Sequence, residues 1–248
     1  MITRQFITEL SIKNQTSEQN IAREYCQHLF LSYLHKRSGA EKMLFKGGTA
    51  LRIVFKSPRF SEDLDFSAYN VSISEINQLV DEILKDIEKE GIQPVKKVNP
   101  ETDGETSGGY FAIINLKLME FDSEIKIQVS LRTKEQIGSN TTLVENDFIP
   151  PYTIVYLEER LLVGEKVRAL LDRAKPRDFF DLYFMLRHRE LVKFVPKDIE
   201  DLKGKLLEVL KNGWEKELKL FLPVSYQTLI KDFQERLKKE IDLHISES

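Results

Sequence analysis

Two glycines and two aspartates are the residues of this chain whose types and spacing indicate chemistry. Gly47 and Gly48 stand before Thr49 at the start of a short apolar segment, and further on Asp63 and Asp65 are separated by one apolar residue. Glycine lets the backbone turn with positive φ and approach a ligand, and the exposed N–H groups at a helix start favour anionic oxygens. We therefore expect the Gly-Gly-Thr segment to cradle the phosphates of a nucleotide.

The aspartate pair suits a divalent cation. Side chains two apart on a strand point to the same face, so Asp63 and Asp65 are expected to meet one ligand while Leu64 and Phe66 point into the core. Two carboxylates suit Mg²⁺, or Mn²⁺, that also binds substrate phosphates. Such a cation would polarise the α-phosphate and orient an attacking hydroxyl. Taken alone, the two motifs are explained about equally well by a turn and an acidic strand end that bind no ligand.

With their flanking residues, these motifs resemble the nucleotidyltransferase superfamily, whose signature is a Gly-Gly or Gly-Ser pair at a helix start followed by Asp-x-Asp. More narrowly, segments 46–51 (KGGTAL) and 59–66 (RFSEDLDF) resemble the AbiEii/AbiGii toxin family. A second block of that family is matched by Lys-x-x-Ala-Leu at 166–170 and Arg-Asp-x-x-Asp-Leu at 177–182. The resemblance covers about residues 45 to 186.

The resemblance implies a role for each matched residue. Asp63 and Asp65 would bind the metal and act in catalysis, Lys166 would reach the triphosphate as a catalytic cation, and Asp178 would face the site as a further catalytic acid. The implied nucleotide-binding set is Lys46, Gly47, Gly48, Thr49, Arg59, Ser61 and Lys166.

Alternatives stay open for several of these residues. Asp178 and Asp181, beside Arg173 and Arg177, fit a helix-packing network of salt bridges nearly as well as a catalytic role. Asp181 itself would cap the helix, pair with Arg177 or join the site. A basic groove for RNA is a further hypothesis, with Lys46, Arg52, Arg59, Lys126 and Arg132 as its members.

The sequence departs from the family pattern at Gln128. On the apolar run 124–131, Glu124, Lys126 and Gln128 share one face, and Gln128 stands where the superfamily usually places its third carboxylate. An amide oxygen can ligate Mg²⁺, but an amide cannot act as a base for the attacking hydroxyl. Either two acids suffice, or Glu124 substitutes, or activity is weak or lost.

The elements that must position these residues begin with helices. Thr16, with Gln19 three residues on, predicts the capping box of an amphipathic helix that ends near Gly39. His28 and His35 on that helix lack a metal-spaced partner, so we expect them to be solvated or packing residues. Ser72 and Glu75 predict a second capping box, for a helix ended by Gly91, and the runs 110–119 and 124–131 predict a β-hairpin.

The composition changes at Pro150-Pro151. After it the apolar pattern is interpreted as helical, including 155–162 ended by Gly164, a helix that starts near Pro176, and helical periodicity at 196–210 and 226–243. We therefore predict two domains, 1–150 and 151–248. The expected fold class is α+β: a nucleotidyltransferase-like mixed β-sheet domain flanked by helices, followed by an α-helical domain that closes over the nucleotide.

Composition sets the outer limits. The chain has 248 residues, 41% apolar and 31% charged, which is typical of a soluble globular protein. A net charge of −3 gives no global signal for nucleic acid, so RNA contact would need a local patch. Cys26 is the single cysteine, which excludes an intrachain disulfide and indicates a reducing, cytoplasmic setting. We find neither an apolar run of membrane-spanning length nor a secretion signal.

Together these observations predict a Mg²⁺-dependent transferase that moves a nucleoside monophosphate from an NTP to an acceptor hydroxyl. By resemblance, the acceptor is RNA, such as a tRNA 3′ end, and the protein is a toxin paired with a cognate antitoxin. One alternative is transfer to Ser, Thr or Tyr of a protein. Another is a non-catalytic nucleotide-binding module, which Gln128 favours. The remaining alternative, a purely structural interaction protein, would not explain why the Gly-Gly, Asp-x-Asp and Lys-x-x-Ala-Leu motifs occur together.

Overall fold

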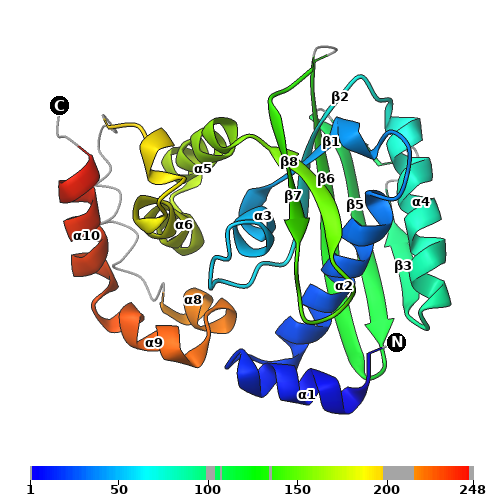
Figure 1. Ribbon diagram of the computed structural model, residues 1–248, viewed down its shortest axis with the longest axis horizontal. Helices are drawn as coiled ribbons and strands as arrows, with labels where there is room; N and C mark the ends of the chain where they lie inside the picture. Colours follow the sequence, from blue (N-terminus) through cyan, green and yellow to red (C-terminus); the bar gives the residue numbers. More distant parts are fainter. Residues whose placement is uncertain (1, 99–103, 107, 134–135, 198–214, 246–248) are drawn as a thin grey trace. The chain divides into compact units, whose positions relative to one another are not determined.

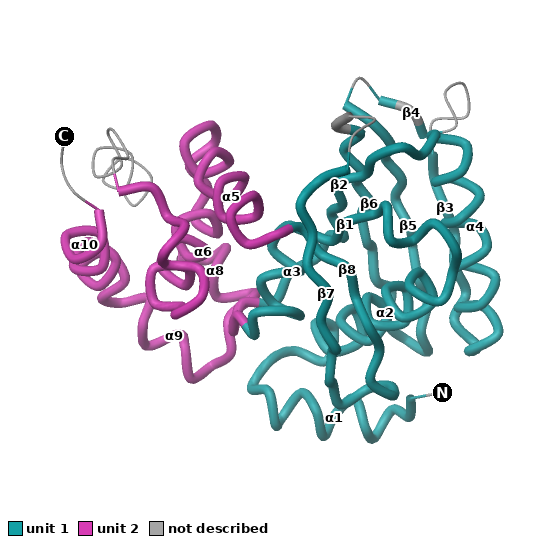
Figure 2. The backbone as a smooth tube through the Cα atoms, turned by 45° about the horizontal axis from the view of Figure 1, so that its top comes forward, with its two compact units in different colours: residues 1–56, 60–157 teal, residues 57–59, 158–248 magenta. Residues whose placement is uncertain are grey.

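The computed structural model describes residues 2–98, 104–106, 108–133, 136–197 and 215–245 (Figure 1). The chain divides into two compact units, residues 1–56 with 60–157 and residues 57–59 with 158–248 (Figure 2). The first unit is mixed α and β, and the described part of the second is helical. The α+β class expected from the sequence is therefore confirmed.

The described part of the first unit is built on one mixed sheet of eight strands. Its strands are β1 (Met43–Lys46), β2 (Leu64–Tyr69), β3 (Gln93–Lys97), β4 (Glu105–Thr106), β5 (Gly109–Leu118), β6 (Phe121–Thr133), β7 (Ser139–Val144) and β8 (Tyr152–Leu157). Seven lie in the order β3-β5-β6-β2-β1-β8-β7, and β4 pairs with β5 outside this path. The β2–β6 and β1–β8 pairs are parallel, whereas β5 and β6 form the predicted antiparallel hairpin.

Among the residues that the structure describes, four α-helices accompany the sheet: α1 (Arg4–Lys13), α2 (Glu18–Leu34), α3 (Gly47–Ile53) and α4 (Ile73–Lys89). The Ser72–Glu75 capping box of α4 is present as predicted, with both reciprocal bonds formed. The cap of α2 is Ser17, which accepts the N–H of Asn20, so the predicted start at Thr16 was wrong by one residue. That helix also ends at Leu34, earlier than expected.

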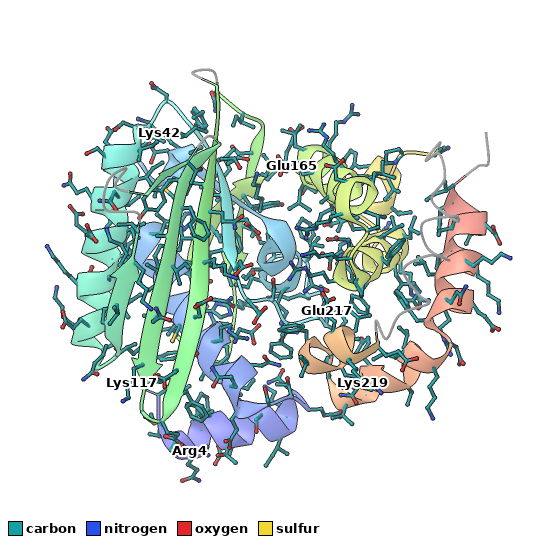
Figure 3. The ribbon with its side chains drawn as sticks, turned by 180° about the vertical axis from the view of Figure 1, so that it is seen from behind. Arg4, Lys42, Lys117, Glu165, Glu217 and Lys219 are labelled. Carbon is teal, nitrogen blue, oxygen red and sulfur yellow. The ribbon has the colours of Figure 1, made fainter. Side chains whose placement is uncertain are left out.

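Helices α2 and α4 cover one face of the sheet (Figure 1). Two hydrogen bonds identify strand residues on this face: the Tyr110 hydroxyl and the Lys96 ammonium both donate to Asn77 Oδ1 on α4, at 3.1 and 2.7 Å. Because strand side chains alternate, their neighbours Phe111 and Lys97 lie on the opposite face. We call that face of β3, β5 and β6 the open face; Figure 3, seen from behind, shows β5 and β6 with no helix in front of them.

The second unit consists of helices packed through aromatic side chains. They are α5 (Glu159–Arg173), α6 (Pro176–Arg187), a 3₁₀ turn η2 (Val192–Phe194), α8 (Glu215–Phe221), α9 (Val224–Lys231) and α10 (Phe233–His244). Phe180 and Tyr183 of α6 contact the ring of Phe233 at centroid distances of 6.1 and 5.6 Å. Pro176 opens α6 as predicted, and the helix expected over 196–210 falls mostly outside the described residues.

The predicted domain boundary needs correction. Residues 155–157, interpreted as the start of a helix, belong to β8 (Tyr152–Leu157), which pairs with β1 and β7, so the first unit continues to Leu157. Burial alternates along it, with Tyr152, Ile154 and Tyr156 inside, as a strand requires. Only Glu158, Glu159 and Arg160 separate the apolar end of β8 from Leu161 and Leu162 of α5, and this short spacing hid the change of period. Gly164, expected to end a helix, lies inside α5.

Among the described residues, none of the helices combines the length and the hydrophobicity that a bilayer-spanning segment needs.

Candidate nucleotide and metal site

Asp65 lies directly against the glycine that opens α3. Strands β1 and β2 pair so that Lys46 is opposite Asp65, and the next residue, Gly47, has φ of +83°. A Cβ placed on Gly47 would lie 2.2 Å from Asp65 Oδ2 and 2.9 Å from Asp65 Cγ. Only glycine satisfies both the positive φ and this close approach. The Gly-Gly turn and the Asp-x-Asp motif therefore form one structural unit.

The segment that carries Asp63 is held by two buried side chains. The Thr49 hydroxyl donates to the carbonyl oxygen of Asp63. Gln27 of α2, only 2% exposed, donates through Nε2 to the carbonyl oxygens of Ser61 and Glu62, at 3.0 Å each. Asp63 thus immediately precedes β2 instead of lying within it, and its backbone position is fixed from both α2 and α3.

Gln128 is the neighbour of Asp65 on the other side. It pairs in register with Asp65 across the parallel β2–β6 ladder, as Lys46 does across β1–β2. Paired residues on adjacent strands point to one face, so the three side chains share it. Gln128 therefore occupies the position beside the acid pair that its place in the sequence predicted. Glu124 lies four residues away along β6, about 13 Å, which makes it a poor substitute.

The donor atoms here fit a hard divalent cation. No cluster of three or more His, Cys, Asp or Glu side chains suited to a metal occurs within the described ranges. The local donors are instead the Asp65 carboxylate and, beside it in register, the amide of Gln128, with Asp63, two residues before Asp65, as the second carboxylate that the sequence predicts. Mg²⁺ commonly binds through one or two carboxylates together with substrate phosphates and water. The site therefore suits a metal that arrives with a nucleotide.

In the second unit, Lys166 belongs to a buried charge cluster. Its Nζ donates to Asp181 Oδ2 at 2.7 Å, and the Arg59 guanidinium binds both oxygens of the same carboxylate, with Nε at 2.9 Å from Oδ1. The Asp181 and Arg59 side chains are only 1% and 4% exposed. Burial alone would raise the pKa of Asp181, but the charges of Arg59 and Lys166 lower it below its usual value. The carboxylate stays ionised.

Asp178 is engaged differently. Its carboxylate accepts two bonds from Arg173, at 2.7 and 2.8 Å, and one from the backbone N–H of Lys175 at the start of α6, at 3.2 Å. The salt-bridge alternative is thus realised at this position. Pairing with Arg177, one of the three alternatives for Asp181, is not realised, because Asp181 binds Arg59 and Lys166. A catalytic role for Asp178 stays a prediction.

Comparison with known proteins decides the family. A model described as nucleotidyl transferase AbiEii toxin, type IV toxin–antitoxin system, matches residues 29–241. The chain belongs to the AbiEii family. Both blocks that suggested the resemblance lie inside the matched range. As an AbiEii protein the chain is a nucleotidyltransferase of the toxin type, and its family implies a cognate antitoxin.

Solved structures share the AbiEii fold. MenT4, a nucleotidyltransferase toxin of Mycobacterium tuberculosis H37Rv, is 15% identical, with 97% of this chain and 89% of that chain covered and a TM-score of 0.64. A candidate nucleotidyltransferase from Helicobacter pylori is 20% identical, with 92% and 95% covered and a TM-score of 0.62. JHP933 from the same species is 20% identical, with 92% of each chain covered and a TM-score of 0.59. Curated proteins gave no match. At these identities the likeness shows the fold alone.

Two members of the hypothetical basic groove have other partners within the AbiEii fold. Arg52 donates to the buried carboxylate of Glu24, with Nε at 2.7 Å, and lies 4.0 Å from the ring centroid of Phe60. Arg59 binds the buried carboxylate of Asp181 through Nε and Nη2. The structure does not describe the Arg132 side chain. Lys46, whose Nζ lies 3.4 Å from Ser130 Oγ, and Lys126 remain candidates.

Both helical histidines are packing residues, as expected. His28 Nδ1 lies 2.8 Å from the Tyr152 hydroxyl, and burial lowers the pKa of His28 to about 3. His35 accepts the N–H of Val155 at Nε2, so its Nδ1 donates to the carbonyl oxygen of Leu31. Both neutral rings thus connect α2 to β8.

Gln27 is the positioning residue that the AbiEii motifs do not contain. Its signal in the sequence is weak: an amide between Cys26 and His28, on a helix whose other buried positions are mostly apolar. A buried polar side chain needs partners, but only the fold shows that these are the carbonyl groups before Asp63.

Proposed function

We propose that this AbiEii protein transfers a nucleoside monophosphate from an NTP to a hydroxyl of RNA in the cytoplasm, in a reaction that depends on Mg²⁺. A tRNA 3′ end is the favoured acceptor, and the cognate antitoxin opposes the toxic effect. The observation that carries the proposal is the contact of Asp65 with Gly47. It brings the predicted metal ligand and the predicted phosphate loop together, as a nucleotide with its metal requires.

The first unit supplies most of the proposed binding site. The N–H groups of Gly47, Gly48 and Thr49 and the ammonium of Lys46 would bind the triphosphate, and Ser61 would contribute from the adjacent segment. Asp63 and Asp65 would hold Mg²⁺, which when bound neutralises phosphate charge and polarises the α-phosphate. Because Gly47 and Asp65 are in contact, phosphate and carboxylate oxygens can reach a common cation.

The reaction forms a bond between the acceptor oxygen and the α-phosphorus and breaks the bond from that phosphorus to the bridging oxygen of pyrophosphate, which leaves. The hydroxyl proton needs a carboxylate or water, since the amide of Gln128 cannot take it. Asp65 is the carboxylate in register with Gln128 and is proposed to receive the proton. Lys166 is proposed to stabilise the leaving pyrophosphate, a role that Lys166→Met tests through the transfer rate.

The decisive experiment incubates the full chain with each α-labelled NTP, Mg²⁺ and total tRNA. We expect label in RNA, lost in the Asp63→Asn/Asp65→Asn double variant and kept in Asp122→Asn, which removes an exposed carboxylate elsewhere on the sheet. Label on protein would move the acceptor to a polypeptide. NTP binding with no transfer to either acceptor would favour the non-catalytic module.

A Gln128→Glu variant tests whether this residue contacts the metal. A third carboxylate beside Asp65 adds negative charge to the cation site, so we expect half-maximal transfer at a lower Mg²⁺ concentration than in the natural sequence. Gln128→Asn, which shortens the side chain without adding charge, is the control. An unchanged Mg²⁺ requirement in the Glu variant would remove Gln128 from the proposed metal site.

A further inference from the structure

The open face carries an aromatic and an aliphatic side chain beside two lysines. Phe111 of β5 pairs with Gln128 of β6, and Ile113 pairs with both Lys126 of β6 and Lys97 of β3. Phe111 and Ile113 are partly exposed, the Lys126 side chain is 42% exposed, and Lys97 is exposed. We call Phe111, Ile113, Lys97 and Lys126 the β5 platform.

The strand register places the β5 platform next to the acid pair. Across the sheet, Phe111, Gln128, Asp65 and Lys46 form one continuous row on β5, β6, β2 and β1. Neighbouring strands are about 4.8 Å apart, so Phe111 and Asp65 are separated by about 10 Å. An RNA strand that reaches Asp65 along the open face would therefore pass over or beside Phe111.

Charge on the open face favours an anionic partner at the end nearest Asp65. Lys97 and Lys126 lie in the row adjacent to that of Phe111, whereas Glu124 is one row further away. Lys126 Nζ is 3.9 Å from Glu124 Oε1, and their side chains are 42% and 52% exposed, so the pair is solvated and holds the lysine weakly. The negative net charge of the chain makes such a local patch necessary for RNA.

We propose that the β5 platform binds the single-stranded 3′ segment of the RNA acceptor. One base stacks on the ring of Phe111, with Ile113 extending the apolar surface, and backbone phosphates contact Lys97 and Lys126. Sheets with partly exposed aromatic side chains bind single-stranded RNA in this way, and stacking tolerates different bases. The inference rests on the proposed function, because the platform serves the hydroxyl that is to react beside Asp65.

The test measures the affinity of the full chain for a labelled single-stranded RNA oligonucleotide with a free 3′-hydroxyl, without NTP. Phe111→Leu keeps an apolar side chain of similar size and removes the ring, so it avoids a cavity. Loss of one stacked base predicts affinity reduced by between about 5-fold and 150-fold. Phe111→Tyr, which keeps the ring, should bind as the natural chain does, and Leu143→Ala controls for loss of an exposed apolar residue on another strand.

Salt dependence tests the lysines separately. Each phosphate contact to a single strand contributes about 0.7 to the slope of log affinity against log salt concentration. We expect Lys97→Ala and Lys126→Ala each to lower the slope by about that amount, and Lys89→Ala, a 76% exposed lysine on α4, to leave it unchanged. Equal slopes in all three variants would overturn the phosphate contacts.

Mg²⁺-dependent NTP binding by the same variants separates the two proposals. The Phe111→Leu chain should keep its NTP affinity while it loses RNA affinity. If the natural chain binds NTP and labels RNA but Phe111→Leu binds and labels RNA equally well, the platform is refuted and the proposed function stands. If the natural chain binds RNA through Phe111 but transfers nothing, the platform stands and the proposed function fails. Label on a polypeptide that Phe111→Leu leaves unchanged would overturn the RNA platform.

Discussion

Replacing Gly47 by alanine is the most direct test of the site. The backbone there has φ of +83°, where an L residue with a Cβ costs about 1 to 2 kcal/mol relative to glycine. The added Cβ would also lie 2.2 Å from Asp65 Oδ2, whereas ordinary contact begins near 3.4 Å. The Asp65 carboxylate must therefore withdraw by about 1 Å, and a misplacement of that size commonly costs about 100-fold in rate.

The expected result has two parts. The free energy of unfolding of the Gly47→Ala chain falls by about 1 to 2 kcal/mol, measured by denaturant titration. The single-turnover rate of nucleotide transfer falls by about 100-fold, and Mg²⁺-dependent NTP binding weakens with it. The rate loss exceeds what the modest loss of stability explains, since most of the protein remains folded.

Gly164→Ala is the matched control. Gly164 lies inside α5, and a Cβ placed on it has no heavy atom within 4 Å. Alanine there should raise the free energy of unfolding by about 0.5 to 1 kcal/mol, because alanine has fewer backbone conformations than glycine in the unfolded chain and a higher helix propensity. Natural transfer activity in Gly47→Ala, or an equal change of stability in the same direction in both variants, would refute the predicted effect of the added Cβ.

Two further predictions concern buried ionisable groups. Asp181→Asn leaves Arg59 and Lys166 without their carboxylate and should lower the free energy of unfolding by about 3 to 5 kcal/mol. The control Asp172→Asn, at an exposed position on α5, should lower it by almost nothing. Equal denaturation midpoints for the two variants would contradict the stabilising role of the Asp181 ion pairs. His28, with its pKa lowered to about 3 by burial, binds a proton more readily when unfolded, so its contribution to stability is complete above pH 6.5 and is lost as the pH falls towards 3. Between pH 7 and pH 5 the free energy of unfolding should fall by about 2 kcal/mol because of His28, and the His28→Gln variant should lack this fall. An unchanged pH dependence of stability in that variant would assign the fall to other groups.

Local sequence patterns were sufficient where neighbours along the chain decide the structure. The Ser72–Glu75 capping box, the Gly47 start of α3 and the β5–β6 hairpin all depend on residues a few positions apart, and the structure contains each of them. The family was also recognisable, because its motifs are short contiguous segments. The alternation along β6 further predicted the face that Gln128 occupies.

Patterns failed where pairing partners lie far apart in the sequence. Residues 152–157 form a strand because β1 and β7 provide its hydrogen bonds, and neither adjoins it. Segment 57–59 belongs to the helical unit, in which Arg59 binds Asp181, 122 residues away. Phosphate binding by Arg59 stays a prediction, and its observed partner, Asp181, lies on a helix far along the chain.

The sequence by itself determined the residues that indicate the chemistry: a Gly-Gly turn expected to bind phosphate, an acid pair, and a glutamine where a third acid is usual, since these depend on residue type and local spacing. Only the tertiary structure decided that Asp65 contacts Gly47, that Gln128 adjoins Asp65 and that Phe111 lies in the same row. The physical reason is that strand register is fixed by hydrogen bonds and buried side chains between segments remote in the sequence, so it has no local signature.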